Sequence, residues 1–212
     1  MRQCLRFPRY LSTMFLTLIW LVAVAASPTK QEERDLQQIF NNGLKIGDGN
    51  WKFTKDRIEV YSWSYGLPAM LVFGEPVEYG TLQATMKDTG FGPNGFQGLV
   101  ICATREVKQD DGYHGSAAYF IRYNRGMIEL LDSIPYHKSP TPTHQLASVP
   151  TEIKVGSDYT LRIAVQDGNL ITVWLDGKNV LEYAAKNKLS GKYALLAANG
   201  SYVFSRVAIS AW

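Results

Sequence analysis

Glu129 and Asp132 are the acidic residues whose spacing comes nearest to that of a glycosidase acid pair, within the stretch MIELLD. Hydrolysis of a glycosidic bond needs two carboxyl groups that flank the bond from one face. A separation of three residues places two side chains on opposite faces of a β-strand. The two residues are therefore the best catalytic candidates in the chain, and their spacing argues against that role.

Several aromatic side chains fall at strand positions that face away from the expected core. If Ile58 and Val60 point inward, Tyr61 and Trp63 need the opposite face, and Trp174 lies between two apolar core positions. A sugar ring stacks its C–H face on such flat rings and pairs its hydroxyls with neighbouring polar groups. Alternatively, these rings pack under loops or against the preceding segment. The candidate ligand-binding residues are Tyr61, Trp63, Arg105, Tyr113, Arg122 and Trp174.

Metal and nucleophile chemistry find little support in the sequence. Asp110 and Asp111 precede Gly112 and offer oxygen ligands for calcium, but the same residues are typical of a plain turn. The histidines follow no zinc-ligand spacing, and there is neither a Gly-x-Ser-x-Gly elbow nor a glycine-rich phosphate loop. We therefore expect no cofactor, with calcium at Asp110 and Asp111 as the one ion left open.

The first residues have the order of an export signal. Arg2, Arg6 and Arg9 form a basic segment, residues 14–24 (MFLTLIWLVAV) form an apolar run, and residues 23–25 (AVA) offer a small-x-small cleavage pattern. The run is short for a bilayer span of about 20 residues. We expect a signal peptide over residues 1–25 and a secreted, extracytoplasmic protein.

Export changes the charge and the cysteine count. Without the three arginines, 19 of the 22 basic residues remain against 19 acidic ones, so the mature chain is nearly neutral. A neutral chain without basic clusters argues against nucleic acid and gives no reason to expect membrane adhesion after cleavage. Cys4 leaves with the signal, and Cys102, inside an apolar run, is expected to be a buried small hydrophobe without a disulfide partner.

The remaining chain has the patterns of an all-β protein. Residues 158–183 alternate apolar and polar positions through two Gly-containing turns, which predicts a three-stranded antiparallel meander. Further short strands are expected from residue 51 to residue 209, around a Pro-rich loop over residues 133–150. Residues 26–46 are polar and are interpreted as an N-terminal tether. The expected core comprises Ile58, Val60, Leu82, Ala84, Met86, Leu99, Ile101, Leu161, Ile163, Val173 and Leu175.

The succession NWKFTKDRIEV, EYGTLQATM, FQGLVICATR, SAAYFIRYNRGMIELL and KYALLAANGSYVFSRVAI resembles the concanavalin A-like superfamily, in particular its laminin-G-like and glucanase-like domains. The resemblance covers residues 47–212 and implies a two-sheet antiparallel jelly-roll β-sandwich, a fold whose members often bind or cleave glycans. The chain is also similar in part to the keto-disaccharide hydrolase branch, whose Glu-x-Gln-x-x-Asp strand is echoed by Glu129 and Asp132. The Asn-Ser-Gly of that branch is replaced here by Phe96-Gln97-Gly98, with Arg105 further on.

Three functional hypotheses follow from these residues and from the resemblance. The first is a secreted carbohydrate-binding domain that recognises a saccharide through exposed aromatic and arginine side chains. The second is a hydrolase or lyase of the same fold acting on a saccharide. The third is an exported structural or adhesive domain whose exposed aromatic residues meet another protein.

The export segment predicts that protein from its native host begins near Ala26 or Ser27. Cleavage should follow the small residues that end the apolar run. Intact-mass and N-terminal peptide mass spectrometry measures this directly. Recovery of residues 1–20 in a membrane fraction would contradict the prediction.

Overall fold

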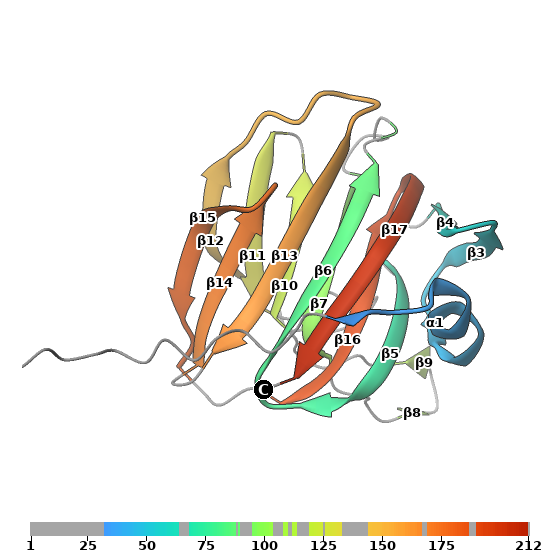
Figure 1. The fold of residues 1–212 in the computed structure, drawn as a ribbon, viewed down its shortest axis with the longest axis horizontal. Coiled ribbons are helices and arrows are strands. Elements are labelled where there is room, and N and C mark those ends of the chain that lie inside the picture. Colours follow the sequence, from blue (N-terminus) through green and yellow to red (C-terminus); the bar gives the residue numbers. More distant parts are fainter. Residues whose placement is uncertain are drawn as a thin grey trace, which may run out of the picture.

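A computed structural model describes residues 32–63, 68–87, 89, 95–103, 108–109, 112–113, 119–124, 126–132, 144–166, 169–186 and 190–211. The described strands form two antiparallel sheets packed face to face, with sheet A in front of sheet B in Figure 1. One short helix, α1, lies beside the sandwich near β3 and β4. The fold is all-β, as the alternating sequence predicts, and it is the two-sheet jelly-roll sandwich that the resemblance implies.

Sheet A contains the central meander. Its strand order is β15-β14-β13-β6-β17-β4-β3, and the short β1 also pairs with β17. Its strands are β1 (Glu32–Glu33), β3 (Gly49–Thr54), β4 (Arg57–Ser62), β6 (Gly80–Lys87), β13 (Asp158–Gln166), β14 (Leu170–Leu175), β15 (Lys178–Ala184) and β17 (Gly200–Ala211).

Sheet B carries the strands that flank the β10–β11 hairpin. Its order is β12-β11-β10-β7-β16-β5-β2. Its strands are β2 (Leu44–Ile46), β5 (Ala69–Val77), β7 (Phe96–Ala103), β10 (Tyr119–Asn124), β11 (Met127–Asp132), β12 (His144–Pro150) and β16 (Gly191–Ala198). Two further short strands, β8 (Lys108–Gln109) and β9 (Gly112–Tyr113), pair with each other.

The meander forms where the sequence predicts it, because its alternation matches the two-residue period of a strand. Leu161, Ile163 and Val165 of β13 are fully buried in the core. The strand β13 pairs with β14 on one side and β6 on the other, each in continuous antiparallel register. Asp176 and Gly177 both have positive φ, at 49° and 81°, in the tight turn between β14 and β15. Glycine adopts this backbone conformation without steric cost, which explains its place in the turn.

The core between the sheets matches the predicted one. Ten of the eleven expected core residues are buried, and Leu175 is partly buried against the same cluster. Leu82, Leu99, Leu161 and Ile163 have no exposed surface. The period-two pattern therefore predicted correctly which face of each of these strands points inward.

The expected tether is partly built into the sandwich. α1 (Leu36–Asn42) follows Asp35, whose carboxylate accepts hydrogen bonds from the backbone N–H groups of Gln37 and Gln38. Ile39 of this helix is buried in the core, and the flanking β1 and β2 pair with β17 and β5. Leu36 and Phe40 pack against the same core, so the described part of the expected tether, residues 32–46, contacts the sandwich.

The expected loop over residues 133–150 ends in a strand. β12 (His144–Pro150) pairs with β11 and forms an edge of sheet B, with a bulge opposite Leu130 and Leu131. Pro150 is tolerated because it is the last residue of an edge strand. The prolines of this stretch obscured the strand, and residues 133–143 lie outside the described residues.

The expected signal peptide, residues 1–25, lies outside the described residues, as does the side chain of Cys102. Within the described part of the chain, no helix combines the length and the apolar character needed to span a membrane.

Truncation of the central meander tests the facing of β13. Leu161→Ala removes a fully buried side chain and should lower the free energy of unfolding by about 2–5 kcal/mol, because lost burial and a residual cavity add. The matched control is Val155→Ala, where the side chain is 67% exposed and the change should stay within about 0.5 kcal/mol. Chemical denaturation measures both, and similar small losses would mean that the facing is misassigned.

Candidate functional site

Each sheet has an outer face that alternation leaves to solvent or to covering segments. On sheet B, Ile121 and Ile128 face the core, so their neighbours Arg122 and Glu129 face outward. On sheet A, Ile163 and Val173 face the core, so Arg162 and Trp174 face outward. Polar side chains that could meet a ligand therefore fall on two opposite sides of the molecule.

Arg122 and Glu129 form the most enclosed described ion pair. They lie directly opposite each other on β10 and β11, and Arg122 Nε donates to Glu129 Oε2 at 2.6 Å. Their side chains are 22% and 12% exposed, so the pair is mostly buried but still reaches solvent. A charge-assisted hydrogen bond in such a setting is stronger than one on an open surface.

The guanidinium of Arg122 extends from the pair toward β7. Its central carbon lies 4.8 Å from the ring centroid of Phe96, a cation–π contact with a buried ring. Gly98 stands directly opposite Arg122 on β7. A Cβ at Gly98 would lie 2.0 Å from the carbonyl oxygen of Ile121, so only glycine fits beside this strand. Position 98 therefore carries no side chain beside Arg122, and the guanidinium contacts the ring of Phe96 on the same strand.

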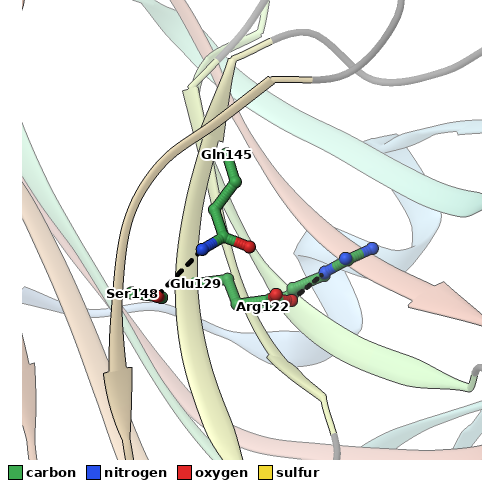
Figure 2. A network of polar contacts seen from close by, with 4 residues as sticks. All are labelled: Arg122, Glu129, Gln145 and Ser148. Carbon is green, nitrogen blue, oxygen red and sulfur yellow. Dashed lines mark hydrogen bonds and ion pairs between the residues drawn. The ribbon is translucent and has the colours of Figure 1, made fainter.

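Polar side chains of β12 lie beside Glu129, on the side away from Arg122. Ser148 is opposite Glu129, and Gln145 Nε2 donates to Ser148 Oγ at 2.9 Å. Figure 2 shows the Gln145 amide extending over β11 above Glu129, while Arg122 points away toward β7. Two residues beyond Arg122, the buried side-chain oxygen of Asn124 has no hydrogen-bond partner among the residues that the structure describes.

These groups leave a defined hydrogen-bonding capacity. Beyond the Nε bond to Glu129, no hydrogen bond is described for the terminal nitrogens of Arg122, and the second carboxylate oxygen of Glu129 can still accept. The pair is neutral in sum, so it offers a donor beside an acceptor without a net charge. Adjacent hydroxyl groups on a ring, which both donate and accept, match this arrangement better than an anion does.

The two acidic candidates do not form a catalytic pair. Glu129 faces outward, whereas Asp132 accepts a hydrogen bond from the backbone N–H of His144 and lies 3.4 Å from its ring Nδ1. Burial, followed by the nearby hydroxyl of Tyr183 and the carboxylate of Asp132, raises the pKa of Tyr119, which packs against the inner cluster. Glu129 and Asp132 thus project to opposite faces, as their spacing of three predicts.

The predicted ligand-binding residues are separated by the fold. Tyr61 and Trp63 lie on the outer face of sheet A, 53% and 55% exposed, with ring centroids 6.0 Å apart. Trp174 lies on the same face, but one face of its indole is covered by the Arg162 guanidinium at 3.7 Å. Burial lowers the pKa of Arg162, and its Nε has no hydrogen-bond partner among the described residues.

Arg122 alone of the predicted ligand-binding residues with described side chains lies on sheet B. Arg105, Asp110 and Asp111 lie outside the described residues, and only the backbone of Tyr113, in β9, is described. No cluster of three or more potential metal ligands occurs among the residues that the structure describes.

Sequence reasoning missed the partners that surround Arg122. Gln145 and Ser148 belong to β12, which was predicted to be part of a loop. Phe96 and Asn124 belong to no sequence motif that indicates a site. The one available signal was the alternation of AYFIRYNRGMIELLD, which places Arg122 and Glu129 outward on a predicted hairpin. Cross-strand pairing then sets the two opposite each other.

Comparison with known proteins agrees with this architecture. No protein-family model matches the chain, and no curated protein matches its sequence. Among solved structures, a carbohydrate-binding module, CBM66 from Bacillus subtilis, aligns with a TM-score of 0.60 and 15% identity over 76% of this chain and 90% of that chain. The fold is a concanavalin A-like jelly roll.

Two further structures share this jelly roll. A Bacillus subtilis protein of unknown function with a galectin-like fold aligns with a TM-score of 0.63 and 12% identity, over 84% of this chain and 97% of that chain. The carbohydrate recognition domain of Emp47p aligns with a TM-score of 0.53 and 16% identity, over 80% and 88% respectively. At these identities the likeness establishes the fold alone.

The burial of the Arg122–Glu129 pair predicts strong coupling between the two side chains. A double-mutant cycle with Arg122→Gln and Glu129→Gln should give a coupling free energy of about 1–3 kcal/mol in denaturant unfolding. The matched control is the Arg57–Glu59 pair on sheet A, at 3.0 Å but with side chains 47% and 34% exposed. Its coupling should be about 0.5 kcal/mol or less, because solvent screens it. Equal couplings would contradict the difference in enclosure.

Proposed function

We propose that this protein is an exported saccharide-binding domain whose primary site is the outer face of sheet B around Arg122 and Glu129. The observation that carries the proposal is the 2.6 Å ion pair, mostly buried yet open to solvent, on a jelly-roll sheet. Its similarity in fold to a carbohydrate-binding module and a carbohydrate recognition domain supports the same reading. The expected export signal agrees with a glycan ligand outside the cell.

The chemistry of the pair favours a neutral saccharide with neighbouring hydroxyl groups. The terminal nitrogens of Arg122 donate to one hydroxyl oxygen, and the free oxygen of Glu129 accepts from the next. Gln145 and Ser148 add an amide and a hydroxyl at the β12 side of the pair.

Holding the arginine in place before binding lowers the cost of association. Arg122 is fixed by Glu129 on one side and by the ring of Phe96 below it. Immobilising a long side chain otherwise opposes binding by about 0.5–1.5 kcal/mol. The Arg122 side chain is therefore already oriented before a ligand binds.

Hydrolysis has weaker support than binding in the described residues. Asp132, the acidic residue nearest to Glu129 along β11, is held by His144 on the other face, so it does not form an acid pair with Glu129. Binding without turnover is therefore the function that the geometry supports best.

A glycan array followed by titration calorimetry tests the proposal. Glu129→Gln and Arg122→Lys should each weaken the best array ligand at least tenfold, about 1.4 kcal/mol, because each removes one half of the donor–acceptor pair. Arg57→Gln, which breaks an exposed pair on sheet A, is the matched control and should bind as the unmodified protein does.

Reducing-sugar release should stay at background with the same ligand. The proposal would be wrong if no glycan bound at millimolar concentration, or if both sheet B variants kept full affinity. Turnover that disappears in Glu129→Gln while binding persists would replace it with the hydrolase hypothesis.

A further inference from the structure

The outer face of sheet A carries a solvent-exposed aromatic pair. Tyr61 and Trp63 project from β4 and its end, and their rings contact each other at an interplanar angle of 38°. The cross-strand neighbours of Tyr61 are Asn50 on β3 and Ser201 on β17, both polar and exposed. The rings are thus a small apolar platform within a hydrogen-bonding surface.

A cleft of about 760 Å³ opens farther along the same face. Its lining includes the hydroxyls of Thr85, Thr160 and Ser205, which are opposite one another on β6, β13 and β17. The Thr85 and Thr160 hydroxyl oxygens are 3.1 Å apart, and either one can donate to the other. The cleft is therefore lined in part by groups that donate and accept, as polyhydroxylated ligands require.

Arg206 enters this cleft through a strained backbone. Its φ is 51°, and it lies in a bulge where the pairing of β17 with β6 shifts between Ser205 and Ala208. Bulges of this kind redirect a side chain, and a non-glycine residue with positive φ persists only at an energetic cost. Arg206 and Asp158 both line the cleft, and within the described part of the chain neither has an ion pair or a side-chain hydrogen bond.

The platform and the cleft are joined along β17. Ser201, beside Tyr61, and Ser205, in the cleft, are four residues apart on one strand, which is about 13 Å at ~3.3 Å per residue. Between them, Val203 is opposite Glu59 on β4 and Lys87 on β6, so a row of mixed polar character connects the two features. One extended ligand can contact both.

We propose that the outer face of sheet A is a second saccharide site, a track for a linear oligosaccharide with one ring on Tyr61–Trp63 and the following rings toward the cleft at Arg206. This inference goes beyond the function proposed above and does not depend on it. Aromatic stacking accepts the C–H face of a sugar, and the hydroxyl-lined cleft pairs with its hydroxyl groups. A protein partner would favour a broader apolar patch than two rings surrounded by polar side chains.

The experiment uses the full chain carrying Glu129→Gln, which disables the site on sheet B. Laminarin-, cellulose-, mannan- and levan-derived oligosaccharides, from disaccharide to hexasaccharide, are titrated by calorimetry and by tryptophan fluorescence. Affinity should rise with chain length until the platform and the cleft are both occupied. Trp63→Ala and Arg206→Gly should each lower the affinity for the longest ligand at least tenfold and remove the dependence on length.

Arg206→Gly separates binding from folding. Glycine adopts a φ of 51° without strain, so this variant should melt no lower than its parent although it loses the ligand contact. The matched control is Asn169→Gly, at a φ of 66° in the turn before β14, which should leave binding unchanged.

The outcomes also distinguish the two proposed sites. If the unmodified protein binds and the Glu129→Gln protein does not, the track on sheet A is overturned and the site on sheet B stands. If the Glu129→Gln protein binds as well as the unmodified one and Trp63→Ala loses that binding, the track stands and the primary site on sheet B is overturned. If Trp63→Ala and Arg206→Gly bind like their parent, or if no oligosaccharide binds at millimolar concentration, the track is wrong.

Discussion

The register between β10 and β11 is the constraint on which the site and much of the core depend. It places Ile121 and Leu130 toward the core and Arg122 directly opposite Glu129 on the outside. A slip of β11 by one residue would turn Glu129 inward and Leu130 outward, and would leave Arg122 without its partner. A buried charge without its partner is strongly unfavourable, so the hydrophobic core and the ion pair select the same register. The β12 strand then adds its polar side chains to a hairpin whose pairing is already determined.

Under the proposed function, the partial burial of Arg122 and Glu129 serves ligand recognition rather than stability. Removing two charges from water opposes folding, and replacing such a pair with apolar residues is often neutral or stabilising. Most of the surrounding outer face of sheet B is apolar and buried, including Met70, Phe96 and Phe120. A polar pair retained in this environment is oriented by its neighbours, and its remaining donors and acceptor keep fixed directions. Position 98 is restricted to glycine, since any side chain there would collide with the backbone of β10.

The two outer faces differ in the contacts that they offer to the proposed ligands. Sheet B presents a single enclosed polar pair above an apolar cluster, which suits recognition of one sugar ring. Sheet A presents exposed rings, hydroxyls and charges over several strands, which suits contact with a longer chain. Packed sheets stand about 10 Å apart, with side chains beyond them on both sides, so one ring cannot touch both faces. Two sites on one domain would allow it to hold two glycan chains at once, which raises the apparent affinity for a polymeric surface.

The sequence by itself determined the fold class, the strands of the meander and the inward residues, because period-two alternation and turn residues are local properties. It also determined that Glu129 and Asp132 face opposite ways, since spacing along one strand settles this. Only the tertiary structure decided that Tyr61 and Arg122, predicted to share a site, lie on different sheets. The order of strands across a sheet depends on pairing between distant segments, which no local pattern records. For the same reason the burial of Ile39 in the core, the edge strand β12 and the platform-to-cleft row became visible only once the two sheets had been assembled.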